Sequence, residues 1–96
     1  MAQQIEGKVV SVGVEGNLVT DIAIDRLETA PRDERLTIFC DEHETNGLHD
    51  TDHGQPAMTY IGMIGNGGFL QLSIVGESAH AMLGVSIGEK VIVKWP

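Results

Sequence analysis

The chain has 96 residues, enough for one small domain, and 42% of them are hydrophobic, which is sufficient for a core. Because aromatic residues make up only 4%, that core must be built mainly from aliphatic side chains. No apolar run approaches the roughly 18 to 20 residues that cross a bilayer. The first residues lack a basic segment followed by an apolar one, so we expect no signal peptide and a cytoplasmic location.

The net charge is −8, from 14 acidic and 6 basic residues without any Lys/Arg cluster. Nucleic acids and anionic membranes are bound through basic residues, so neither is an expected partner. The single cysteine, Cys40, excludes an intramolecular disulfide and a multi-cysteine zinc site. It ends a short apolar run, and Asp41 and Glu42 beside it would raise the pKa of its thiol, so we interpret it as a core residue rather than a nucleophile.

The first half of the chain alternates between strand-like segments and turns. Residues 5–14 are rich in valine, and residues 18–24 place Leu, Thr, Ile and Ile on alternate positions. Residues 15–17, Glu-Gly-Asn, form a turn signature between them, so these two segments predict a hairpin. The polar stretch 25–34 predicts a loop with about one helical turn, and residues 36–40 predict a short strand.

The middle of the chain predicts a second hairpin. Residues 57–64 and 69–75 are apolar runs on either side of residues 65–68, Gly-Asn-Gly-Gly. Gly-rich segments that bind phosphate are followed by a helix, but a strand follows here, so we interpret these glycines as a turn. The acidic stretch 41–55 predicts the tip of a hairpin and a loop.

Residues 77–83 are the one plausible helix, with a cap residue at its start and Gly84 as its stop. Its buried face is expected to consist of Ala79, Met82 and Leu83. Residues 90–95 predict a last strand. Six or seven short strands and one late helix indicate an all-β fold, a small closed or partly closed Greek-key β-barrel with one short helix near the C-terminus. Residues 1–96 then form a single domain.

Several motifs resemble the carboxy-terminal domain of the S-adenosylmethionine hydroxide adenosyltransferases, relatives of the bacterial fluorinase. Residues 7–22 contain G-K-V-V and E-G-N-L-V-T-D-I, similar to the family pattern G-x-V … F-G-N-L-x-T-N-I. Residues 64–72, I-G-N-G-G-F-L-Q-L, are similar to I-N-S-x-G-Y-L-E-I. Residues 76–79 and 83–91 resemble G-x-S-A … L-G-x-x-x-G-D-x-V. The resemblance covers nearly the whole chain and implies that domain's small Greek-key barrel.

The resemblance also implies a limit on activity. Family members are two-domain proteins whose amino-terminal domain supplies the acidic residue that handles the ribose and the attacking water or halide. The active site lies between that domain and the carboxy-terminal domain of a neighbouring subunit in a trimer. This sequence has no counterpart of the amino-terminal domain, so the family's reaction cannot be completed by this chain alone, and we expect no catalytic residue in it.

The first ligand-contacting motif of the family is kept in part. Asn17 matches the asparagine that touches the ligand. Glu15 stands where the family has an aromatic residue, and Gly13 where it has an acidic one. The loss of the ring removes a stacking contact of a kind worth roughly 1 to 3 kcal/mol for a base.

The other two ligand positions have also changed. Asn66 and Gly67 stand at the positions of a serine and a variable residue that is an arginine in fluorinase. A Thr-aromatic pair, whose ring packs on the adenine, aligns with Thr51 and Asp52, so the ring is missing. Asn17, Asn66 and Thr51 are therefore the candidate ligand-binding residues, with S-adenosylmethionine or adenosine as the ligand that the resemblance implies.

Three histidines, His43, His49 and His53, lie in the acidic stretch 41–55 and are candidate zinc or nickel ligands. They lack the i, i+4 spacing or CxxC knuckle of recognisable metal sites, so a solvated acidic loop is the competing interpretation. His80, in the predicted helix, is interpreted as a surface residue.

Three functions follow as hypotheses. The leading one is a non-catalytic barrel module that acts through contacts with a protein partner or as a homo-oligomer, without a cofactor. The second is a nucleoside- or S-adenosylmethionine-binding subunit that completes an active site with a separate catalytic domain. The third is a metal-binding module that uses the three histidines.

Overall fold

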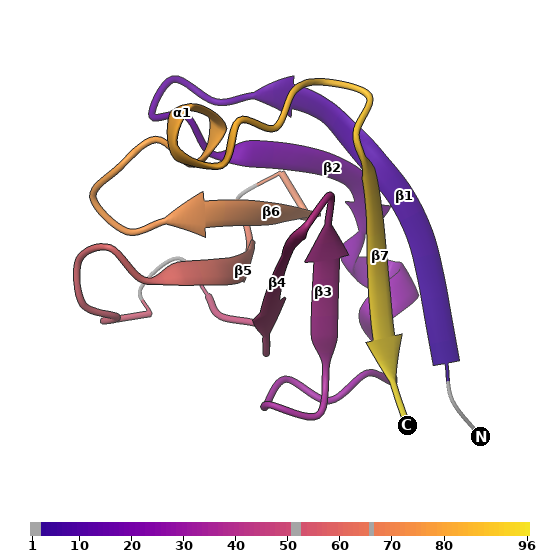
Figure 1. Ribbon diagram of the computed structural model, residues 1–96. Coiled ribbons are helices and arrows are strands. Elements are labelled where there is room, and N and C mark those ends of the chain that lie inside the picture. The colour runs from indigo at the N-terminus through magenta and orange to yellow at the C-terminus, as the bar shows by residue number, and fades with distance from the viewer. Residues whose placement is uncertain (1–2, 51–52, 66) are drawn as a thin grey trace.

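The architecture was taken from a computed structural model, which describes residues 3–50, 53–65 and 67–96 (Figure 1). Seven strands, one 3-10 helix and one α-helix follow one another along the described chain. They are β1 (Gln3–Val12), β2 (Leu18–Ala23), η1 (Ile24–Leu27), β3 (Thr37–Cys40), β4 (His43–Asn46), β5 (Tyr60–Ile64), β6 (Phe69–Ile74), α1 (Ala79–Leu83) and β7 (Lys90–Trp95). Neither helix has the length and apolar character that a membrane-spanning helix requires.

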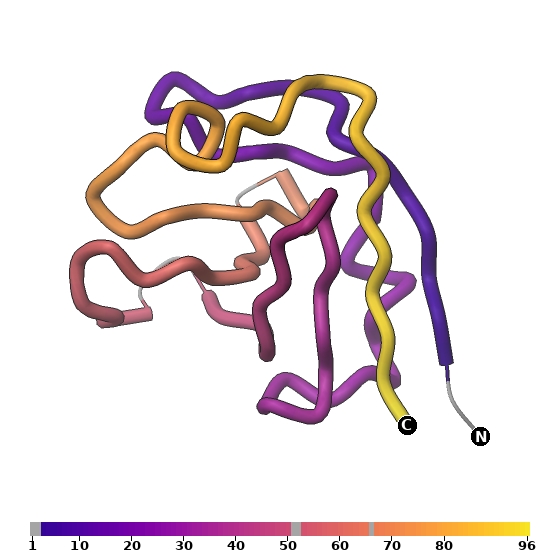
Figure 2. Tube along the Cα trace, viewed as in Figure 1, coloured from indigo at the N-terminus to yellow at the C-terminus, as the bar shows by residue number. Residues whose placement is uncertain are grey.

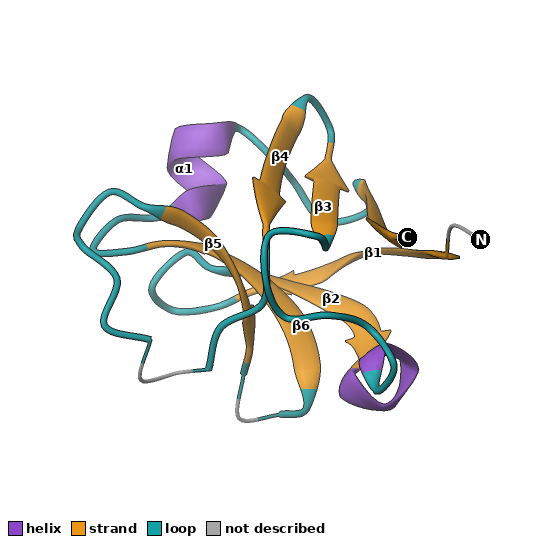
Figure 3. Cartoon of the chain, turned by 90° about the horizontal axis from the view of Figure 1, so that it is seen from below, coloured by secondary structure: helices purple, strands orange, loops and turns teal. Residues whose placement is uncertain are grey.

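The strands form one antiparallel sheet in the order β4-β3-β7-β1-β2-β6-β5. The last strand, β7, inserts between β1 and β3, so the order departs from the sequence order. β3–β4 and β5–β6, at the two ends of the sheet, curl around the core toward one another (Figure 3). The predicted all-β, small, nearly closed Greek-key barrel with one short late helix is therefore confirmed.

The two edges of the sheet meet through β4, β5 and the segment between them. The Thr45 hydroxyl donates to the Tyr60 carbonyl at 2.8 Å. The His49 N–H donates to the Gly62 carbonyl at 2.9 Å, and the Ile64 N–H donates to the His49 carbonyl at 3.0 Å. These bonds satisfy backbone groups that an open edge would leave exposed, so the barrel nearly closes without a seventh continuous ladder between β4 and β5.

The core is aliphatic, as the composition predicts. Its fully buried side chains come from β1, β2, β3, β5, β6, β7 and α1 and from the segments before β3 and after α1, and they include Leu18, Ile22, Leu36, Ile38, Ile61, Leu70, Leu72, Ala79, Val85, Val91 and Val93. One polar side chain, Thr20, is also buried. Its hydroxyl donates to the Leu70 carbonyl at 2.7 Å and accepts from the Ile22 N–H at 3.2 Å, which joins β2 to β6.

Most predicted elements form, with four differences. The strand expected within residues 57–64 begins only at Tyr60, because Met58 has a positive φ in the turn before it. Residues 43–46 of the expected tip and loop are the strand β4. The helix starts at Ala79 instead of residue 77, because Ser78 is its N-cap and accepts from the Ala81 N–H. Met82 is half exposed rather than part of the buried face. The C-terminal stop is confirmed, since Gly84 takes the left-handed conformation after α1.

Candidate functional site

Asn17, the ligand position that the resemblance retains, lies at the end of the β1–β2 turn and is half-buried. Its side-chain amide donates to the Gln71 side-chain carbonyl, on β6. Its backbone carbonyl accepts from the Gly13 N–H at 2.8 Å, which holds the turn. The amide that would recognise a ligand is therefore used to tie the β1–β2 hairpin to β6.

Two glycines make room for this pair of amides. A Cβ at Gly13 would overlap the Asn17 side chain, and a Cβ at Gly65 would overlap the Gln71 side chain. Asn17 and Gln71 are 54 positions apart, and nothing in either local sequence indicates that they meet. Gln71 is thus a site residue that only the structure reveals.

The other candidate ligand residues, Asn66 and Thr51, lie outside the described residues, as does Asp52. The turn beside Asn66 is held by the Gly68 N–H, which donates to the Gly65 carbonyl at 3.0 Å. Gly68 has a φ of +80° and its carbonyl accepts from the Ile24 N–H, so this glycine-rich segment is a hairpin turn, as predicted.

A cleft of about 640 Å³ opens next to the Asn17–Gln71 pair, on the outer face of β5 and β6. It is an open groove rather than an enclosed cavity, and no described lysine or arginine lines it. Its lining residues are Glu15, His53, Met63, Ser73, Ile74, Val75, Gly76, Glu77 and Ser78. Glu15 thus lines the cleft with a carboxylate, at a position where the resemblance would place an aromatic ring.

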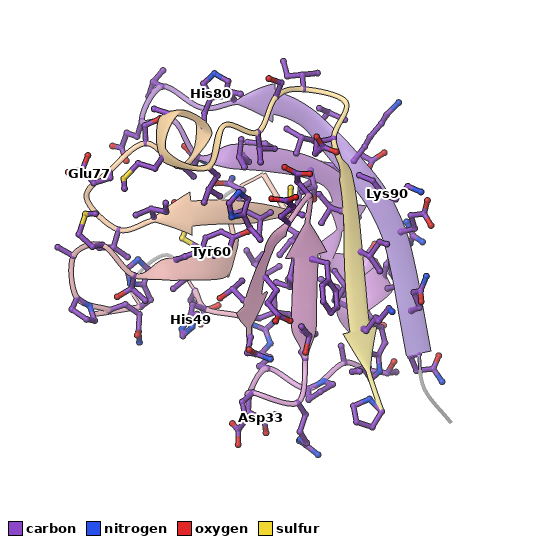
Figure 4. All side chains as sticks on the ribbon, in the orientation of Figure 1. Asp33, His49, Tyr60, Glu77, His80 and Lys90 are labelled. Atoms are coloured by element: carbon purple, nitrogen blue, oxygen red, sulfur yellow. The ribbon has the colours of Figure 1, made fainter. Side chains whose placement is uncertain are left out.

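The cleft is held together by backbone contacts between distant segments. The His80 N–H donates to the Gly16 carbonyl at 2.8 Å, which places the β1–β2 turn against the start of α1. The Glu77 N–H donates to the Ile74 carbonyl at 3.0 Å. Glu15 and Glu77 therefore line one groove from two rigid turns, and neither takes part in an ion pair with a described residue. Figure 4 shows Glu77 and His80 at the same end of the molecule.

The three candidate metal ligands make contacts of their own. His43 Nε2 lies 3.1 Å from the Leu83 carbonyl at the end of α1, and His53 Nδ1 accepts from the Gln55 N–H at 2.9 Å. The rings of His49 and His53 meet edge to face with their centroids 6.3 Å apart. Among residues 3–50, 53–65 and 67–96, no group of three His, Cys, Asp or Glu side chains is placed to hold a metal ion.

Cys40 is fully buried at the end of β3, as predicted for a core residue. Burial raises the pKa of its thiol to about 11, and the nearby carboxylates of Glu89 and Asp41 act in the same direction. The sequence predicts the effect of Asp41, whereas that of Glu89 comes from the packing of β7 beside β3. Tyr60 is also largely buried, and burial raises the pKa of its phenol. Neither group is prepared for nucleophilic chemistry near neutral pH.

Four exposed apolar side chains lie on adjoining segments at one end of the barrel. Val14 is fully exposed, and Ile87, Met82 and Val10 have exposed fractions of 63%, 52% and 42%. They lie on the β1–β2 hairpin, on α1 and on the segment between α1 and β7, which run side by side (Figure 2). The Gly88 N–H donates to the Val9 carbonyl at 2.8 Å, which joins two of these segments. We call Val10, Val14, Met82 and Ile87 the cap surface.

Comparisons with known proteins give a fold but no family. No protein-family model and no curated protein matches this sequence. An uncharacterized conserved protein of Thermotoga maritima has a similar structure, with a TM-score of 0.79 and 18% identity over 94% of this chain and 35% of that chain. A conserved hypothetical protein of Thermus thermophilus is similar with a TM-score of 0.73 and 19% identity, over 92% of this chain and 34% of that one. The chain thus spans about a third of the length of either protein.

Proposed function

We propose that this chain is a non-catalytic β-barrel module that acts by binding another protein through the cap surface. The observation that carries the proposal is the gathering of four of the six exposed large apolar side chains of the described residues on three adjoining segments. Single exposed apolar residues are ordinary on a protein surface, but a group of them marks an interaction site.

The geometry around Asn17 supports this function over ligand recognition. The side-chain amide of Asn17 is hydrogen-bonded to Gln71. Where the resemblance would place an aromatic ring nearby, this chain has the carboxylate of Glu15. A small-molecule site depends on a few unengaged polar groups aimed at the ligand, together with apolar walls. The barrel keeps the framework of the adenosyltransferase-like domain while its side chains serve internal contacts.

A different polypeptide suits the cap surface better than a second copy of this chain. Each copy has a net charge of −8, so two copies repel one another, whereas a basic partner is attracted.

The test is purification of the tagged chain from its source, followed by a binding assay with each co-purifying protein made separately. We expect one protein to bind directly, and the variant Ile87→Asp to weaken binding about 30-fold, as for the loss of a central apolar contact. The matched control, Glu34→Asp in an exposed turn near the other end of the barrel, should bind normally. Equal binding by both variants, or a wild-type chain that binds only itself, would refute the proposal.

The second candidate is a nucleoside- or S-adenosylmethionine-binding subunit that works with a separate catalytic domain. It is favoured by one observation: Glu15 and Asn17, at positions that contact the ligand in the family that the chain resembles, lie in the turn that borders the cleft of about 640 Å³. Isothermal titration with adenosine and with S-adenosylmethionine decides between the candidates. A saturable heat of binding that is lost in the variant Asn17→Ala would favour the ligand-binding subunit. A module that binds only protein should give no heat of binding with either compound.

A further inference from the structure

The cleft beside the cap surface has a lining that suits a basic side chain. Its acidic groups are the carboxylates of Glu15 and Glu77, which come from two turns held against each other. His53 also lines the cleft, and no described lysine or arginine does. Met63 adds an apolar surface from β5, and Ser73 adds a hydroxyl from β6. A long basic side chain combines the same features, since its stem is apolar and its head is a cationic hydrogen-bond donor.

We infer that this cleft receives an arginine or lysine side chain of the protein that binds the cap surface. The inference rests on the proposed function, because Val14 of the cap surface and Glu15 of the cleft are neighbours in the β1–β2 turn. Ser78 in the cleft likewise caps the helix that carries Met82. A partner that covers the cap surface therefore reaches the cleft.

The shape of the cleft favours a side chain of a protein over a free small cation. Small-molecule sites are mostly apolar and enclose the greater part of the ligand. This cleft is open to solvent and polar over much of its surface. A partner that is already anchored on apolar contacts does not need an enclosing pocket, and the net charge of −8 attracts its basic residues.

The experiment titrates the full ¹⁵N-labelled chain with acetyl-Gly-Arg-Gly-amide and observes amide chemical shifts. We expect shifts at residues 15, 63 and 73–78, and none with the neutral citrulline peptide of the same shape. The double variant Glu15→Gln/Glu77→Gln should weaken binding at least about tenfold, as expected for lost charge-assisted bonds. The control Glu34→Gln/Glu42→Gln, which makes the same change in net charge outside the cleft, should bind like the wild type.

Two results would overturn the inference: equal shifts with the citrulline peptide, or equal weakening by the control variant. Amide signals of the double variant that keep their wild-type chemical shifts away from the cleft show that the variant is folded. Ile87→Asp should leave peptide binding intact, so a failure of this inference is distinguishable from a failure of the proposed partner interface.

Discussion

Cys40 shows how burial, together with nearby carboxylates, sets the chemistry of a residue. The folded chain keeps the thiol proton up to about pH 11, whereas the unfolded chain releases it near the ordinary value of 9.0. Because the unfolded state then binds fewer protons, the free energy of unfolding falls as pH rises from about 9 to about 11. Burial of Tyr60 acts in the same direction.

We therefore expect urea unfolding between pH 8 and pH 10.5 to show stability decreasing above pH 9. The contribution of Cys40 approaches about 1.4 kcal/mol per pH unit within that window. The variant Cys40→Ala should be somewhat less stable than the wild type at pH 7, but its free energy of unfolding should fall less steeply above pH 9. An identical decline in both proteins would show that the thiol is not the titrating group. Iodoacetamide should label Cys40 only after unfolding.

Asn17 and Gln71 provide a second prediction at this scale. If their hydrogen bond is structural, Asn17→Ala and Gln71→Ala should each lower the free energy of unfolding by about 1 kcal/mol. The double variant should then lose little more than either single variant, because the two changes remove the same contact. Fully additive losses in urea unfolding would contradict the contact.

At the scale of the element, strand β1 shows what a sequence pattern can and cannot give. The alternation of residues 5–14 predicts the strand, which forms as Gln3–Val12. However, Val9 pairs with Thr20 and Ser11 with Val19, so the ladder shifts between them. Val9 is buried and Val10 is exposed by ordinary alternation, but the bulge leaves Ser11 exposed as well and returns Val12 to the half-buried side. A bulge depends on the partner strand, so the sequence of β1 alone does not reveal it.

The hairpin turns were predictable because glycine and asparagine mark them locally. Strand β4 was not, because His43–Asn46 is polar and acidic, and its strand form comes from pairing with β3. The site follows the same division. The turn that carries Glu15 and Asn17 was evident in the sequence. The cleft, however, also needs Glu77, and the hydrogen bond of Asn17 needs Gln71. Both of these residues lie far along the chain from the turn.

Gly16 tests the contact between the β1–β2 turn and the start of α1. It has a φ of +86°, and a Cβ there would overlap both the side chain and the backbone of Ser78. Gly16→Ala should therefore lower stability by about 2–4 kcal/mol, from backbone strain and overlap together. Gly84 is the control: its φ is +68° with open space around it, so Gly84→Ala should cost only about 1–2 kcal/mol. Equal losses in urea unfolding would mean that the turn and the helix do not touch.

At the scale of the whole molecule, the charge of −8 acts on stability as well as on partner choice. The three ion pairs among the described residues are solvent-exposed and contribute little. Self-repulsion therefore outweighs them, and salt should relieve it. We expect the Tm to rise between about 0.02 and 0.3 M NaCl by ~2–4 °C, which corresponds to about 0.5 kcal/mol for a domain of this size. A lower Tm in calorimetry would indicate that favourable ion pairs dominate.

We expect a partner to occupy one end of the barrel and to leave the other end free. His80 and Asp33 lie near opposite ends (Figure 4), and the cap surface lies on the side of His80. The direct measurement is photo-crosslinking in the source cell with a benzophenone side chain in place of Ile87, compared with the same group in place of Glu34. A single crosslinked protein from position 87, absent from position 34, is the predicted result. Crosslinks of equal yield from both positions, or a chain at position 87 linked only to its own copies, would contradict the account.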